Sequence, residues 1–204
     1  NLRIFNTYFY GWAEYNGYIY KKFDISFDKR ILDIGSSYGH NLIHFSKDSV
    51  GIEVRHDLVL FSRGLGLNVV EGNIEDSLPI SEKFDLVWCT DFLVHLVSPY
   101  KFLYDCRKLL NTGGKIVIQI PLMSFLNNHK SSCHFYAFNK KSLIYLLEMA
   151  GYKIINTSGC VRKMPKFLNY ILEPVLQIIG GNIWILAEKR EGELNYEKSF
   201  LPAW

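Results

Sequence analysis

Several features that would assign this chain to a particular class of protein are scarce in it. Its four cysteines lie far apart and form no C-x-x-C pair, so we expect reduced thiols, with neither a disulfide framework nor a zinc site of the usual spacing. No apolar run reaches the length of a membrane span, and the first residues carry no secretory signal pattern. The sequence therefore predicts a cytoplasmic protein without an integral membrane segment.

Excess charge of either sign is also missing. The chain has 23 Lys and Arg against 20 Asp and Glu, a formal net charge of +3, and no long basic block concentrates it. Nucleic acid is therefore not expected as a partner. No internal repeat or low-complexity linker divides the sequence, and 204 residues with 49% hydrophobic content suit one domain with a single large core.

A glycine-bearing turn follows a short apolar run near the N-terminus. Residues 31–34 are typical of a buried strand, and Gly35 and Gly39 come directly after it. Glycine adopts backbone dihedral angles that are closed to other residues, and it leaves room for a ligand to approach. The pattern indicates a strand that ends in a nucleotide-binding loop, although an ordinary strand-to-helix turn has the same appearance.

Expected strands and helices alternate along the rest of the chain. The strand units predicted after the first cover residues 49–54, 67–75, 84–90, 115–120, 153–156 and 182–187. A turn is expected at 111–114, and a helix from Asn139 to Gly151. This alternation favours a doubly wound α/β fold, a mostly parallel sheet with helices on both faces and a ligand at the C-terminal ends of the strands.

Residues 30–190 resemble the class I S-adenosylmethionine-dependent methyltransferases of the small-molecule type. The family's D-x-G-x-G-x-G loop matches Asp33, Gly35 and Gly39, with Ser37 where the middle glycine usually stands. The chain from Phe84 to Pro121 is similar along its whole length to the family's fourth strand, following helix and fifth strand. The resemblance implies a Rossmann-like sheet of seven strands with an antiparallel last strand, and S-adenosyl-L-methionine as the cofactor.

The resemblance also implies which residues bind the cofactor. The acid that binds the ribose falls on Glu53, and the pair that contacts adenine falls on Asn73 and Ile74, the first of which is more often Asp. The cofactor-binding residues expected from the resemblance are Asp33, Gly35, Ser37, Gly39, Glu53, Asn73, Ile74 and Thr90.

Methyl transfer to a hydroxyl group requires alignment, exclusion of water and removal of a proton. His95 is the first candidate for the general base, because imidazole titrates near neutral pH. A structural histidine that pins the loop is the alternative. Asp91 is the second candidate, and its alternative role is to cap a helix N-terminus.

Two segments are expected to meet the methyl acceptor. The aromatic-rich segment 1–29, which includes Tyr10, is expected to be a lid over the site, a cover for one face of the sheet, or both. After the fifth strand, His129, His134 and Tyr136 are predicted acceptor contacts, unless this loop is simply solvated. No metal is expected, because two histidines five residues apart without a nearby acid are a weak basis for a site.

The apolar segment 166–179 has three interpretations: core packing, a wall of the acceptor pocket, or a weak membrane or dimer surface. Residues 191–204 are expected to form a tail that docks on the body of the protein or on a second subunit. A homodimer is therefore one of the expected alternatives.

The expected function is methyl transfer from S-adenosylmethionine to a small molecule, with oxygen as the first choice of acceptor atom and nitrogen or carbon next. A catalytically silent cofactor-binding module is one alternative. A dinucleotide-dependent oxidoreductase is another, because Tyr136 and Lys140 have the Tyr-x-x-x-Lys spacing of short-chain dehydrogenases, although residues 35–39 lack that family's glycine pattern.

Overall fold

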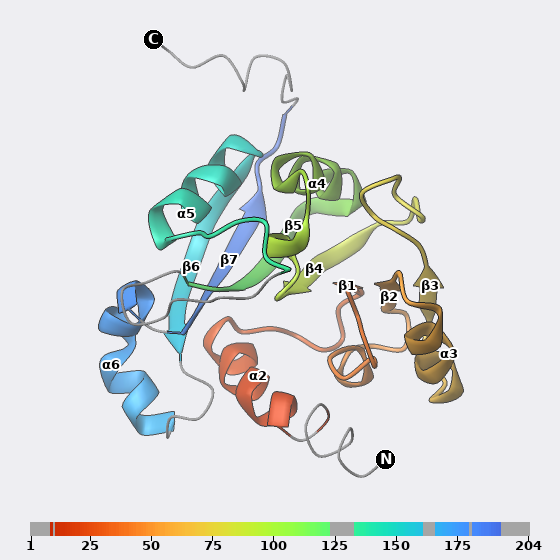
Figure 1. Ribbon diagram of the computed structural model, residues 1–204, viewed down its shortest axis with the longest axis horizontal. Coiled ribbons are helices and arrows are strands. Elements are labelled where there is room, and N and C mark those ends of the chain that lie inside the picture. The colour runs from red at the N-terminus through yellow and green to blue at the C-terminus, as the bar shows by residue number, and fades with distance from the viewer. Residues whose placement is uncertain (1–8, 10, 123–132, 161–165, 180, 193–204) are drawn as a thin grey trace.

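A twisted seven-stranded sheet forms the centre of the molecule (Figure 1). The computed structural model describes residues 9, 11–122, 133–160, 166–179 and 181–192. Across the sheet the strands follow the order β3-β2-β1-β4-β5-β7-β6. Their bounds are Ile31–Ile34 (β1), Val50–Glu53 (β2), Val69–Glu71 (β3), Phe84–Thr90 (β4), Leu110–Pro121 (β5), Tyr152–Cys160 (β6) and Asn182–Lys189 (β7).

The first five strands run parallel, and β7 is antiparallel to both of its neighbours, β5 and β6. The chain moves outward from β1 to β3 and then returns to place β4 on the other side of β1. Ligands of doubly wound sheets bind at such a reversal, outside the C-terminal ends of the strands. The predicted fold, including the antiparallel last strand, is confirmed.

Helices cover both faces of the sheet (Figure 1). One face carries α2 (Gly11–Lys22), α3 (His56–Gly64) and α6 (Lys166–Ile179), and the other carries α4 (Pro99–Cys106) and α5 (Lys140–Met149). Single 3₁₀ turns lie at Leu42–His44 (η2), Leu93–His95 (η3) and Arg107–Leu109 (η4). In the described part of the chain, no helix combines the length and the apolar content needed to cross a membrane.

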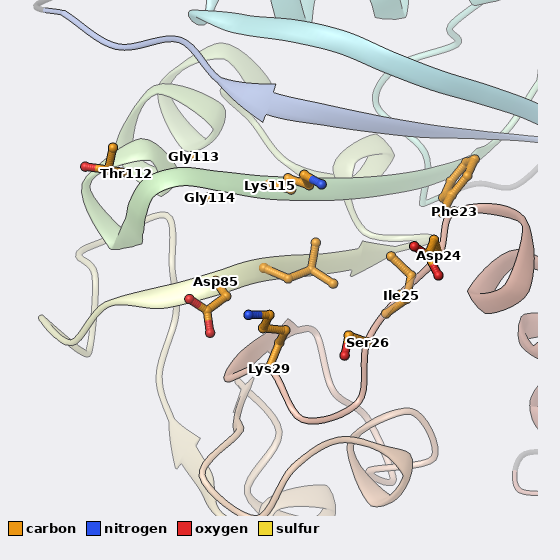
Figure 2. A pocket seen from close by; sticks show the side chains of 11 residues that line it. Phe23, Asp24, Ile25, Ser26, Lys29, Asp85, Thr112, Gly113, Gly114 and Lys115 are labelled. Atoms are coloured by element: carbon orange, nitrogen blue, oxygen red, sulfur yellow. The ribbon is translucent and has the colours of Figure 1, made fainter.

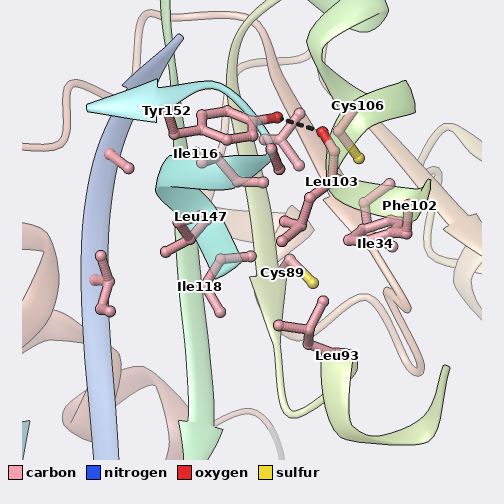
Figure 3. Close-up of a cluster of buried hydrophobic side chains, with 14 of the residues drawn as sticks. Ile34, Cys89, Leu93, Phe102, Leu103, Cys106, Ile116, Ile118, Leu147 and Tyr152 are labelled. Atoms are coloured by element: carbon pink, nitrogen blue, oxygen red, sulfur yellow. Dashed lines mark hydrogen bonds between the residues drawn. The ribbon is translucent and has the colours of Figure 1, made fainter. Parts of the chain in front are cut away.

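Side chains that alternate along the strands divide the apolar interior into two clusters. Leu32 and Ile34 belong to the cluster under α4 and α5, whereas Ile31 belongs to the cluster under α2. In the first cluster the hydroxyl of the fully buried Tyr152 donates to the carbonyl oxygen of Leu103 at 2.9 Å (Figure 3). This bond satisfies the polar atom that Tyr152 brings into the core.

The second half of α2 is part of the core. Ile19, Tyr20 and Phe23 are buried, and the Tyr20 ring lies 5.0 Å from that of Trp88 on β4, centroid to centroid. At these residues the aromatic segment therefore packs on one face of the sheet. Tyr10 lies outside the described residues.

Two predicted boundaries were wrong. The turn expected at 111–114 lies inside β5, where the register with β4 shifts and a β-bulge accommodates Gly113 at φ 67°. Strand β6 runs to Cys160 rather than ending near residue 156, because it pairs with β7 over its whole length. Near the end of β6, an added Cβ at Gly159 would meet the backbone nitrogen of Gln177, so α6 packs directly against this strand.

Candidate active site

A cavity of about 700 Å³ lies at the C-terminal ends of β1, β2 and β4. This is the reversal point of the sheet, and the volume is in the range of small-molecule sites. Five predicted cofactor residues line it, namely Gly35, Glu53, Asn73, Ile74 and Thr90. Both predicted base candidates, Asp91 and His95, line the same cavity.

Glu53 ends β2 with its side chain at the cavity wall, and the residue is only 7% exposed. One carboxylate oxygen accepts from the backbone N–H of Ser37 and the other from that of Arg55, each at 2.9 Å. Each oxygen keeps capacity for a further donor, so the group can accept from two neighbouring hydroxyls of a ligand.

The loop from Gly35 to Gly39 has three residues in the left-handed region of the backbone. Gly35, Ser37 and Gly39 have φ values of 68°, 50° and 75°. A Cβ on Gly35 would lie 2.7 Å from the ring of Phe92, so the glycine is required by a close approach as well as by its dihedral angle. Ser37 adopts a conformation that costs about 1–2 kcal/mol for a residue with a side chain.

Asp33 lies outside the cavity, on the face of β1 that Ile31 shares. Neither of its carboxyl oxygens has a hydrogen-bond partner among the described residues. Burial, reinforced by the nearby Glu53, raises the pKa of Asp33 well above its ordinary value. The carboxyl group therefore favours its neutral, protonated form beneath the loop.

Asn73 and Ile74 form the turn after β3. The Asn73 amide oxygen accepts from Glu75 N–H at 3.1 Å, and its amide nitrogen donates to Asp76 at 3.0 Å. Ile74 is buried and offers an apolar surface to the cavity. The Asn73 oxygen has a second lone pair, so it can still accept from a ligand.

Asp91 follows β4 with φ 54°, and its backbone N–H donates to the carbonyl of Gln119 at 2.8 Å. Its alternative role as a helix cap is not seen, because Phe92 holds the N-cap position of η3 and makes no side-chain cap bond. Asp91 is exposed at the mouth of the cavity.

His95 closes η3 with its ring half-buried and its Nδ1 atom 3.0 Å from the carbonyl oxygen of Cys133. A carbonyl oxygen only accepts, so Nδ1 carries the proton, and in the neutral ring the lone pair is on Nε2. The histidine is thus pinned to the loop through Nδ1, and the Nε2 lone pair is not used by this bond.

The segment from Cys133 to Phe138 lies along η3 and the residues after it. Phe135 N–H donates to Val94 O at 2.9 Å, and the Tyr136 hydroxyl donates to Val97 O at 2.8 Å. His134 packs edge-on against His95, with ring centroids 4.8 Å apart. Of the predicted acceptor contacts, His134 therefore lies beside a base candidate, Tyr136 supports the loop, and His129 and Tyr10 lie outside the described residues.

Comparisons with known proteins agree on the family. A family model described as a methyltransferase domain matches residues 32–118. A ubiquinone biosynthesis O-methyltransferase of Glaesserella parasuis is 28% identical over 115 residues, 50% of this chain and 49% of the relative. A methyltransferase domain therefore covers residues 32–118, as the resemblance to the class I S-adenosylmethionine-dependent methyltransferases predicts. The predicted family, and with it the enzyme class and the cofactor, is confirmed.

Solved structures place this methyltransferase among neighbours of the same fold. A SAM-dependent methyltransferase from Archaeoglobus fulgidus has a TM-score of 0.65 at 21% identity, covering 92% of this chain and 99% of that one. The [4+2]-cyclase SpnF has a TM-score of 0.67 at 16% identity, covering 88% and 81%. The fold therefore accommodates other chemistry, and the methyltransferase spans about half the length of the ubiquinone relative.

The residues around the cavity fit the methyltransferase cofactor. The Glu53 carboxylate suits the two ribose hydroxyls, and Asn73 and Ile74 suit the polar edge and the apolar face of adenine. Among the predicted cofactor residues, Ser37 reaches the cavity indirectly through its bond to Glu53. Gly39 packs against Ser62 and Leu67, where an added Cβ would collide.

Sequence reasoning missed eight of the residues that line the cavity, and Arg55, Phe92 and Cys133 are the three of these that bear on the site. Arg55 acts through its backbone N–H, and Phe92 through its contact with the loop glycine, so neither role depends on a recognisable motif. Cys133 has no C-x-x-C partner, but it is the residue directly before a histidine already predicted to meet the acceptor.

A second cavity of the methyltransferase, of about 280 Å³, lies on the opposite side of the sheet from the strand C-termini, where β4 and β5 begin (Figure 2). Lys29, Asp85 and Lys115 line it near the N-terminal ends of β4 and β5. The carboxylate of Asp85 already accepts from Arg30 N–H and from the Asn111 side chain. Doubly wound sheets bind their ligands at the C-terminal ends of the strands, not at these N-terminal ends.

Proposed function

We propose that this methyltransferase transfers a methyl group from S-adenosylmethionine to an oxygen atom of a small molecule. The observation that supports oxygen is the state of His95, because an imidazole with its free lone pair on Nε2 at the cavity can remove a hydroxyl proton. The name of the Glaesserella relative, an O-methyltransferase, supports the same acceptor atom. A small-molecule acceptor and a cytoplasmic location belong to this proposal.

Each cavity residue has a separate role in the proposal. The cofactor supplies a methyl group that its sulfonium already activates. Glu53 accepts hydrogen bonds from the ribose, and Asn73 and Ile74 bind the adenine. Gly35 keeps the loop close to Phe92, and Thr90 lines the cavity wall.

His95 is the proposed base, with His134 beside it on the acceptor side. Asp91 is the second candidate for the base. A reaction of this kind rests mostly on alignment, so the hydrogen bonds that hold the segment after Cys133 against η3 fix the position of the base.

The base is tested by pairing His95→Asn with His56→Asn. His56 is an exposed histidine at the start of α3 that pairs with Glu71, so its loss controls for removal of an imidazole. Purified variants would be offered a panel of phenols, alcohols, thiols and amines with S-adenosylmethionine, and methylated products detected by mass. We expect His95→Asn to lower turnover on hydroxyl acceptors by about 100- to 10,000-fold at neutral pH, with unchanged affinity for S-adenosylhomocysteine.

The pH profile separates a base from a structural histidine. The wild-type rate should depend on pH in a way that the rate of His95→Asn does not, because only a neutral imidazole ring accepts a proton. Near-normal turnover of His95→Asn with the same pH dependence would remove the base. Methylation of amines alone would overturn the choice of oxygen.

A silent binding module is the second candidate function, because the fold also serves a cyclase. Calorimetry with S-adenosylmethionine, S-adenosylhomocysteine and NAD distinguishes the alternatives. Cofactor binding without any methylated product favours the silent module, and binding of NAD favours the oxidoreductase. Against the latter, Tyr136 bonds to Val97 and Lys140 to Gln177, so the two side chains engage different partners.

A further inference from the structure

Three side chains of ligand type meet beside the cavity, and two of them, His95 and Cys133, line it. His95 comes from η3, and Cys133 and His134 come from the segment before α5. Their ligating atoms all lie within 4.8 Å of one another, although His95 and Cys133 are 38 residues apart in the sequence. Cys133 is exposed and both histidines are half-buried, so an ion can reach the cluster from solvent.

Hydrogen bonds outside the cluster hold its two parts together. Phe135 N–H bonds to Val94 O, and the Tyr136 hydroxyl bonds to Val97 O, on either side of His95. The chain that carries Cys133 and His134 is therefore fixed against the turn that carries His95. A site held in this way is organised before any ligand arrives.

The protonation of His95 suits a metal ligand. Its Nδ1–H donates to the carbonyl oxygen of Cys133, which leaves the Nε2 lone pair for an ion. Histidines that bind zinc almost always donate their other ring N–H to a carboxylate, a carbonyl or water, and this bond fixes the ring. In this cluster the backbone of one candidate ligand orients the ring of another.

We propose that His95, Cys133 and His134 bind a zinc ion, with the fourth position open to the cavity. Two imidazoles and one thiolate suit zinc, whereas magnesium and calcium prefer oxygen ligands. Three protein ligands and one open position are the arrangement of catalytic zinc sites. Zinc bonds of about 2.0–2.3 Å place the ligand atoms of a tetrahedral site about 3.3–3.6 Å apart, so the cluster closes by about 1 Å on binding.

The zinc ion would select the class of acceptor, and this step rests on the proposed function. A hydroxyl bound at the open position loses its proton to solvent near neutral pH, because zinc lowers the pKa of a bound oxygen. The acceptor oxygen then bonds to the methyl carbon while the carbon–sulfur bond breaks, and the sulfonium becomes a neutral thioether. With zinc bound, His95 is a ligand and the metal replaces it in activating the hydroxyl.

Metal binding is measured first, without any methyl transfer. The full chain is stripped with a chelator, then titrated with Zn²⁺ alone and with Co²⁺ alone. We expect one ion per chain and, with cobalt, a thiolate-to-cobalt charge-transfer band in the near ultraviolet. Cys133→Ser should lose this band. Its zinc affinity should fall by more than 10- to 100-fold, which is the typical loss when a residue that only hydrogen-bonds to a metal ligand is replaced. His56→Asn, which removes a histidine outside the cluster, should bind as the wild type does.

Several results would overturn the site. The first is a wild-type protein that binds less than one zinc ion per chain, and the second is a Cys133→Ser variant with the same cobalt spectrum as the wild type. The third is a loss of zinc affinity in His56→Asn as large as the loss in Cys133→Ser. Thermal unfolding of Cys133→Ser near the wild-type temperature shows that the variant is folded, and His134→Asn gives an independent second loss of a ligand.

Turnover then separates failure of the zinc site from failure of the proposed function. If His95 acts as a base without metal, Cys133→Ala keeps near-normal turnover and chelators have no effect, which refutes the role of zinc and leaves methyl transfer intact. If zinc activates the acceptor, Cys133→Ala loses turnover. Added zinc then restores the activity of the chelator-treated wild type but not that of Cys133→Ala. Stoichiometric zinc without any methylated product keeps the site and refutes the proposed function.

Discussion

Replacing Glu53 by glutamine tests the cofactor site with the smallest change in shape. The carboxylate is 7% exposed and accepts two backbone N–H groups, from Ser37 and Arg55. Glutamine keeps one accepting oxygen but turns an NH₂ group towards the other N–H. One buried donor is then unsatisfied, so we expect a loss of about 1–3 kcal/mol in the free energy of unfolding.

The same change weakens the cofactor's ribose contacts. Hydrogen bonds to a charged acceptor contribute about 1.5–3 kcal/mol and are roughly twice as strong as neutral ones. Affinity for S-adenosylhomocysteine, which binds without reacting, should therefore fall by about 10- to 150-fold for Glu53→Ala and by less for Glu53→Gln. Calorimetry at neutral pH measures the affinity, and urea unfolding measures the stability.

Glu71→Gln is the matched control for Glu53→Gln. Glu71 lies opposite Glu53 in the register of β2 and β3, its side chain is 41% exposed, and it pairs with His56 outside the cavity. We expect no change in its affinity for S-adenosylhomocysteine. Unchanged affinity in folded Glu53→Ala and Glu53→Gln would remove Glu53 from the site. If Glu53→Gln and Glu71→Gln lost equal affinity for S-adenosylhomocysteine, the loss would come from the change in net charge and not from a contact with the cofactor.

Gly35→Ala should abolish measurable binding of S-adenosylhomocysteine, because its Cβ would lie 2.7 Å from the Phe92 ring. Gly113→Ala is the control, since Gly113 has a similar φ of 67° and no described atom near the position of an added Cβ. The control should lose only about 1–2 kcal/mol of stability through backbone strain. Equal binding by the two variants would exclude a role for the Phe92 contact. Asp33→Asn should gain stability relative to wild type as pH rises above about 4, by up to about 1.4 kcal/mol per pH unit. The raised pKa keeps folded Asp33 protonated while the unfolded chain ionises, so wild-type stability falls with pH until the folded pKa is passed. A pH-independent difference in urea unfolding near pH 5 and pH 8 would contradict this. Gly159→Ala should destabilise the fold by about 1–3 kcal/mol, because its Cβ would meet the backbone of α6, and calorimetry should find cofactor affinity unchanged. A fully stable variant would show that α6 can move away from β6.

Local chemistry made much of the fold predictable. The strands before Gly35 and around 84–90 are short apolar runs, and each appears where the pattern indicated. The helix expected after Asn139 begins there because the Asn139 side chain accepts from Ser142 N–H at 2.9 Å, in a capping box with the Ser142 hydroxyl. Such signals need only neighbouring residues.

The rest depends on contacts between distant residues. The extent of β6 follows from its pairing with β7, because Asn156 and Gly159 are of types that are depleted in strands. Cys133 and His95 meet only through the folding of the segment before α5, so spacing along the sequence gave no indication of their cluster. Asp33 matches the family motif, yet its side chain lies on the buried face of β1, and a motif does not specify which side chains reach a cavity.

The position of β7 between β5 and β6 has a consequence for synthesis on the ribosome. Strands β1 to β5 are made first and can pair with one another while the last two strands have not emerged. Strand β6 is made before β7 but joins the sheet only through it, so β5 presents an unpaired edge until residues 182–189 arrive. Open strand edges invite pairing with other chains, so the nascent protein is most exposed to aggregation at β5 during this interval.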